Sequence, residues 1–161
     1  MLDNLIDLIK QHAGNAIVNN PDVPNSQNDA TVQEAGNSII SGLKNMISQG
    51  KGQEVLNLLQ NKGGDIATNP AVQNISGGFI QTLMNKFGLD QNAAGGVANN
   101  LIPNVLQNLV HKTNDPNDKS FDLQGIIGSL TGGQGIQGIV GELEQGGGAG
   151  IMDKIKGLFG K

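Results

Sequence analysis

The sequence predicts an all-α protein, a compact bundle of five or six helices with a glycine-rich C-terminal tail. Apolar residues recur at intervals of three and four along most of the chain, which is the period of an amphipathic helix. Hydrophobic residues make up 37% of the 161 residues, but only four are Phe and none is Tyr or Trp, so the core must be aliphatic. A chain of this length can bury one such core without disulfides or metal ions.

The first predicted helix starts at the amino terminus and ends near Asn19, and its apolar face consists of Leu2, Leu5, Ile6, Ile9, Ala13, Ala16 and Ile17. Proline, asparagine and serine dominate residues 19–29, so we expect a loop that gives the core nothing to bury. A second helix is predicted to begin between Asn28 and Thr31, with Thr31 and Glu34 as a capping box. Its apolar positions are Val32, Ala35, Ile39, Ile40, Leu43 and Ile47.

A short third helix is predicted to end before residues 61–65 and to bury Val55, Leu56, Leu58 and Leu59. Asn69 followed by Pro70 is a strong start signal for the fourth helix, because Asn caps well and proline costs nothing at the first helical position. Gly88 is expected to end that helix and Asp90 to cap the next. The apolar face of the fourth helix consists of Val72, Ile75, Phe79, Ile80, Leu83, Met84 and Phe87.

The fifth predicted helix contains Pro103 among its apolar positions, which are Val97, Ala98, Leu101, Ile102, Val105, Leu106, Leu109 and Val110. Inside a helix, Pro103 would leave the carbonyl of Asn99 without its donor and cost about 3 kcal/mol. This cost nearly disappears if the helix breaks at residues 101–102 and a new one begins at the proline. Pro103 is therefore predicted to mark a helix kink or restart.

Two parts of the chain resemble each other. Residues 31–47 and 71–87 carry the same residue at five aligned positions, and residues 54–65 resemble residues 104–115. A duplicated helix pair would produce this pattern and would give a bundle with a pseudo-twofold axis. The alternative is chance similarity, which a sequence of low complexity makes common.

Glycine recurs every three or four residues from position 125 to position 141. The run is too short for collagen and lacks proline, so it indicates either a face where helices approach closely or a flexible segment. We accordingly divide the chain into a helical bundle (1–122), a glycine-rich segment (123–150) and a C-terminal amphipathic helix (151–161).

The C-terminal segment is the one candidate interaction face in the sequence. If it is helical, its apolar side chains share one face and Asp153, Lys154 and Lys156 lie opposite. Such a short helix is marginal in water and needs a partner surface. The bundle itself, a second copy of the chain or an anionic membrane could each supply that surface. The apolar positions are Ile151, Met152, Ile155, Leu158 and Phe159.

Composition argues against several partners and locations. All ten cations are Lys, none is Arg, and the net charge is −4, so nucleic acid is not an expected partner. The absence of cysteine removes disulfides and thiolate sites and fits a reducing compartment. The first ten residues lack a secretory signal, and no apolar run is long enough to span a membrane. We expect a cytoplasmic protein.

No motif for catalysis or metal binding stands out. His12 and His111 fall in different helices and are expected to be exposed near helix ends, and no cluster of Cys or His accompanies them. Residues 114–122 are rich in oxygen ligands, but Lys119 and Ile126 occupy positions where a calcium loop needs oxygen, so we expect a polar turn. We therefore expect no catalytic residue, no cofactor and no metal site, and interpret the protein as not an enzyme.

Residues 85–118 resemble the core of the YidB-like family of small bacterial proteins, whose function is uncharacterised. Gly88, Leu89 and Asp90 match the family's helix end and cap, and Ile102 with Pro103 matches its Leu-Pro pair. Thr113 and Asp115 fall near its terminal turn, although this chain has KTNDPND where the family has a tighter turn. The resemblance implies a compact all-α fold and brings no catalytic residue, cofactor or substrate.

Two classes of function fit these observations. The first, which we prefer, is a non-enzymatic interaction or self-assembly module that forms homo-oligomers through apolar helix faces. The alternative is a peripheral membrane protein that attaches to anionic lipid through the C-terminal amphipathic helix.

Overall fold

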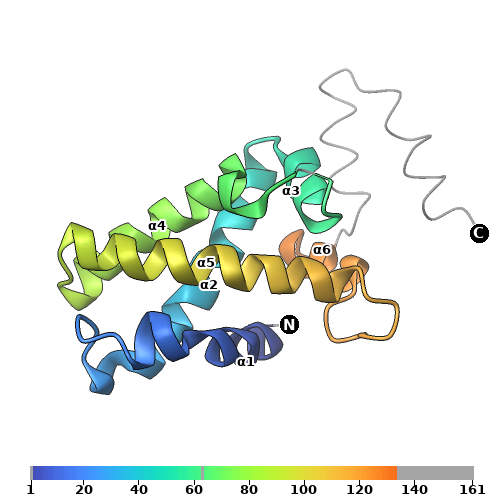
Figure 1. Cartoon of the computed structure of the whole chain (residues 1–161). Coiled ribbons are helices and arrows are strands. Elements are labelled where there is room, and N and C mark those ends of the chain that lie inside the picture. The colour runs from blue at the N-terminus through green and yellow to red at the C-terminus, as the bar shows by residue number, and fades with distance from the viewer. Residues whose placement is uncertain (1, 63, 134–161) are drawn as a thin grey trace, which may run out of the picture.

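The computed structural model describes residues 2–62 and 64–133. In this part of the chain six α-helices form a bundle without strands, so the predicted all-α fold is confirmed (Figure 1). The elements are α1 (Leu2–Ala13), the π-helical η1 (Gly14–Val18), the 3₁₀ turn η2 (Asn25–Gln27), α2 (Asn28–Ser48), α3 (Gly52–Leu59), the 3₁₀ turn η3 (Ile66–Thr68), α4 (Pro70–Phe87), α5 (Gln91–Thr113) and α6 (Leu123–Leu130).

Helix α5 is the central element of the bundle. It packs against α4 on one side and α1 on the other, while α2 contacts both α1 and α4 (Figure 1). The core between these helices is aliphatic, as composition requires, apart from Phe79 and Phe121. The largest side chains that are fully buried are Phe79, Ile9, Ile17, Ile39, Leu43, Leu58, Leu59, Ile75, Leu83, Leu101, Ile102 and Leu106.

The amino-terminal helix ends as predicted, but the loop after it differs. Helical structure continues to Val18, and its last five residues form the π-helical segment η1. The expectation that the loop buries nothing is wrong, because Val23 is only 2% exposed. A tight turn explains this, since the backbone N–H groups of Asp22 and Val23 both donate to Asn20 and fold the loop back onto the core.

The predicted capping box of the second helix is also wrong. Helix α2 already begins at Asn28, and Thr31 is fully buried within its first turn. The Thr31 hydroxyl donates to the carbonyl of Gln27 at 2.8 Å rather than capping. Glu34 instead accepts from Lys86 of α4 at 2.7 Å, so a tertiary contact replaces the local one.

The predicted ends of α4 and the start of α5 are confirmed. The Asn69 side chain accepts from the N–H of Ala71 at 2.9 Å, and Pro70 occupies the first helical position. Gly88 ends α4 in the left-handed conformation, with φ at 67°. Asp90 caps α5 by accepting from the N–H of Ala93 at 2.7 Å.

Helix α5 runs through Pro103 without interruption, so a restart there is wrong, while a kink at Pro103 stays a prediction. Leu101 and Ile102 before the proline and Val105 and Leu106 after it are all buried. A break at Pro103 would pull part of this apolar stripe out of the core, which costs more than one missing hydrogen bond. Asn99, whose carbonyl loses its donor, is exposed and can be hydrated there.

The bundle extends beyond the predicted boundary at residue 122. Helix α6 is capped by Asp122, whose side chain accepts from the N–H of Gly125 at 2.8 Å, and it packs against α2. Because Ile126, Ile127 and Leu130 are buried, a flexible chain is the wrong interpretation for this part of the glycine-rich segment. The rest of that segment from residue 134, and the predicted helix at 151–161, lie outside the described residues.

Helices α2 and α4 pack antiparallel to each other. The Glu34–Lys86 ion pair joins the start of α2 to the end of α4, and Gly42 in the second half of α2 contacts Ile75 near the start of α4. A twofold axis perpendicular to the two helices would relate them in this way. This arrangement is consistent with a duplication of residues 31–47 and 71–87, which stays a prediction.

Candidate functional site

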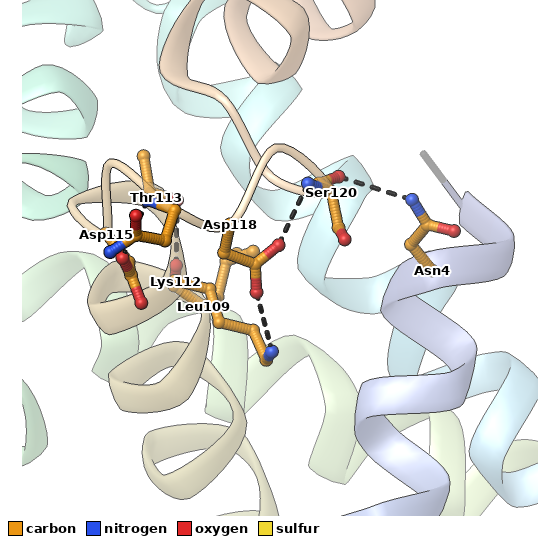
Figure 2. A network of polar contacts seen from close by, with 8 residues as sticks. Asn4, Leu109, Lys112, Thr113, Asp115, Asp118 and Ser120 are labelled. Carbon is orange, nitrogen blue, oxygen red and sulfur yellow. Dashed lines mark hydrogen bonds and ion pairs between the residues drawn. The ribbon is translucent and has the colours of Figure 1, made fainter.

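A polar network fixes the loop that follows α5 (Figure 2). Lys112 donates to a carboxylate oxygen of Asp118 at 2.8 Å, and the other oxygen of Asp118 accepts from the N–H of Ser120 at 2.9 Å. The side chain of Asn4 donates to the carbonyl of Ser120 at 3.2 Å. These bonds tie the loop both to the end of α5 and to the start of α1.

The network leaves Asp118 as an ionised acceptor. The hydrogen bond from Lys112, supported by the bond from Ser120, lowers the pKa of Asp118 from 3.8 to about 2. Asp115 accepts from the N–H of Asn117 at 2.9 Å in a second turn of the same kind. The polar turn predicted for residues 114–122 is therefore confirmed, and in the described chain no three His, Cys, Asp or Glu side chains lie together as metal ligands would.

One hollow of about 620 Å³ lies between the α3–α4 connection and the end of α5. His111 is exposed there, as expected, and Asp65 and Asp115 also line it. Both carboxylates are engaged in turns, since Asp65 accepts from the N–H of Ala67 at 3.0 Å. The side chain of Asn114 closes the base by donating to the carbonyls of Leu59 and Val110, which joins α3 to α5.

A second hollow, of about 610 Å³, lies between the end of α1 with η1 and the first half of α5. His12 is half-buried here and not exposed as expected. We call this space the amide hollow, because Asn and Gln side chains dominate its lining of Gln11, His12, Gly14, Asn15, Ala16, Asn20, Gly96, Asn100 and Asn104.

A ladder of three asparagines runs along α5 beside the amide hollow. The side-chain nitrogens of Asn100, Asn104 and Asn108 donate to the backbone carbonyls of the residues four positions earlier, at 2.9, 2.6 and 2.9 Å. The first two asparagines line the hollow and Asn108 does not. Their spacing of four residues is visible in the sequence, and it is the signal that could have identified this ladder.

The predicted interaction face at Ile151, Met152, Ile155, Leu158 and Phe159 lies outside the described residues. Within the described ranges, no helix combines the length and apolar character that a bilayer span requires. The chain shows no significant match to a family model, a curated protein sequence or a solved structure.

Proposed function

We propose that this protein is a non-enzymatic self-association module and that residues 151–161 form its contact face. The observation that carries the proposal is the burial of the bundle's apolar side chains. Leu2 and Val18, at 39% and 49% exposed, are the large hydrophobic side chains that the described bundle exposes. Because association of protein surfaces is driven by contiguous apolar patches, these helix faces offer little for a partner to cover.

The C-terminal segment has the apolar pattern that the outside of the bundle lacks. Five large apolar residues would share one face of a helix over residues 151–161. Burying one such side chain contributes roughly 1.5–3 kcal/mol. A twofold contact would bury the same face from each of two copies, which supports a dimer as the simplest assembly.

The test is the mass of the full-length protein in lipid-free buffer, measured by light scattering after gel filtration. Ile155→Asp combined with Phe159→Asp places charges in the apolar face and is expected to reduce an oligomer to a monomer. Lys154→Gln combined with Lys156→Gln changes the opposite face and is the matched control, with no expected loss of mass. A wild-type monomer, or an oligomer that the aspartate variant leaves intact, contradicts the proposal.

The second candidate is attachment to anionic membranes through the same segment. It is supported by charge, because residues 151–161 contain three Lys and one Asp in a chain whose net charge is −4. Membrane attachment predicts that the lysine control loses binding to phosphatidylserine vesicles and that salt weakens binding of the wild type. Vesicle binding by a protein whose mass the aspartate variant does not change would favour this candidate.

We also infer membership in the YidB-like family. The helix end at Gly88, the cap at Asp90 and the polar turn after α5 occur at the positions where the resemblance expects them. Family membership would add a shared fold and no activity. The structure of a family member with helices connected differently around the Leu-Pro pair would contradict this inference.

A further inference from the structure

We propose that the amide hollow binds a neutral, polyhydroxylated ligand, a short oligosaccharide. This inference concerns the face between α1 and α5 and is independent of self-association through residues 151–161. It follows from the orientation of the amide groups on the two walls and from the absence of Asp, Glu and Lys from the lining.

The α5 wall presents hydrogen-bond acceptors in fixed positions. A backbone carbonyl can only accept, so the side-chain nitrogens of Asn100 and Asn104 must face the carbonyls of Gly96 and Asn100. The two Oδ1 atoms then point away from these bonds, and neither accepts a hydrogen bond from any described residue. Because the backbone bonds hold both amides in place, a ligand would not have to order them on binding.

The wall formed by η1 presents donors. Asn19 donates to the Oδ1 of Asn15 over a long 3.5 Å, which leaves the N–H groups of Asn15 available. Asn20 donates one N–H to the carbonyl of Ala16 at 3.1 Å and accepts from the N–H of Asp22 at 3.0 Å, which leaves its second N–H as a further donor. Gln11 adds a further amide with both a donor and an acceptor.

A hydroxyl group both donates and accepts, so a ligand with several hydroxyls can satisfy the free amide oxygens of the α5 wall and the remaining N–H donors of both walls. The lining contains no Asp, Glu or Lys and a single His12, so a charged ligand would lose hydration with no carboxylate or ammonium group to pair with. An apolar ligand would leave the amides without hydrogen bonds. These penalties favour a neutral polyol over either alternative.

The size of the hollow fits this ligand class. Its volume of about 610 Å³ lies within the roughly 300–1,000 Å³ of small-molecule sites. Gly14 and Gly96 line it with no atom within 4 Å of where a Cβ would be, so a sugar ring can approach the backbone there. The protein has no Tyr or Trp to stack on a sugar, so affinity must come from hydrogen bonds and is expected to be weak.

The experiment is a titration of the ¹⁵N-labelled full-length protein with maltotriose, cellotriose and triacetylchitotriose, followed by NMR. The expected result is saturable shifts of the Asn100 and Asn104 side-chain amides with at least one sugar. Asn104→Leu should weaken binding about tenfold or more, because it removes a hydrogen-bonding group from the site. Asn108→Leu changes the same ladder outside the hollow and should leave binding unchanged.

A second matched pair covers the case in which Asn104→Leu disturbs α5. Gly96→Met fills the hollow and keeps the backbone carbonyl that accepts from Asn100, so it should abolish binding, whereas Gly95→Met, at a residue outside the lining, should not. The absence of saturable shifts with all three sugars would overturn the proposal. Equal weakening by Asn104→Leu and Asn108→Leu would overturn it as well.

Discussion

Gly42 sets how closely α2 and α4 approach each other. A Cβ atom at this position would lie 2.6 Å from Cγ1 of Ile75, a side chain that is only 2% exposed and cannot move away. We expect Gly42→Ala to lower the free energy of unfolding by roughly 1–3 kcal/mol, because overpacking outweighs the better helix propensity of alanine.

Gly78 provides the matched control on the facing helix. A Cβ atom there meets nothing within 4 Å, so Gly78→Ala should raise the free energy of unfolding by up to about 1 kcal/mol. Urea unfolding of both variants measures the difference. A Gly42→Ala protein as stable as the Gly78→Ala protein would mean that α2 and α4 can move apart without a loss of unfolding free energy.

The ion pair in the loop after α5 makes stability depend on pH. The pKa of Asp118 is lowered to about 2 by Lys112, so its carboxylate stabilises the fold above the unfolded value of 3.8. That contribution is lost as the pH falls from 3.8 towards about 2. We expect the Asp118→Asn variant to have a lower free energy of unfolding than wild type at neutral pH. The difference in free energy of unfolding between the two proteins should become smaller as the pH falls from 3.8 towards about 2.

The pKa itself can be read from the carboxyl carbon of Asp118 in an NMR titration. In the Lys112→Met variant the pKa of Asp118 should rise towards 3.8, because the largest cause of its shift is removed. A pKa of Asp118 that stays near 2 in this variant would show that the turn, and not Lys112, holds it down.

At the residue scale, helix caps that depend on neighbouring residues could be predicted from the sequence, whereas contacts between distant helices could not. Asn69 and Asp90 cap helices through bonds to residues two or three positions away, so the sequence indicates them directly. Thr31 and Glu34 have the same local pattern, but burial of Thr31 and the Lys86 contact override it. Asn15 of η1 and Asn100 of α5 line one hollow only because η1 packs on α5, so no local pattern could place them there.

At the scale of elements, Pro103 is the clearest conflict between local and tertiary preference. It stays inside α5 because the apolar residues on both sides are buried. We expect Pro103→Ala to restore a donor for Asn99 and to raise the free energy of unfolding by roughly 1–3 kcal/mol, after allowing for the greater entropy of the unfolded chain.

Pro70→Ala is the matched control, since proline at the first helical position carries no such cost. It should be neutral or slightly destabilising in the same urea measurement. A Pro103→Ala variant that is less stable than wild type would indicate that the bundle requires the proline's geometry.

The amphipathic period predicted which helices exist, because one apolar face per helix is what a bundle buries. It did not predict α6, because this helix has only eight residues and two of them, Gly125 and Gly128, have low helix propensity. Helix α6 is stabilised by burial of Ile126, Ile127 and Leu130 against the rest of the core. Such tertiary contacts cannot be predicted from the sequence of the segment itself.

At the scale of the whole molecule, the described bundle buries nearly all of its large apolar side chains, with Leu2 and Val18 as the exposed ones. Composition and periodicity predicted the all-α class and the single aliphatic core. They could not indicate which surface covers residues 151–161, because the bundle itself, a second copy of the chain and an anionic membrane would each fit the same apolar pattern.

The mass of the full-length protein compared with a version ending at residue 150 tests self-association most directly. Light scattering after gel filtration should show a full-length oligomer and a truncated monomer, with the truncated bundle retaining its helical circular dichroism. An oligomer that survives truncation would locate the contact in the bundle. Monomers in both cases would contradict self-association and direct attention to vesicle binding.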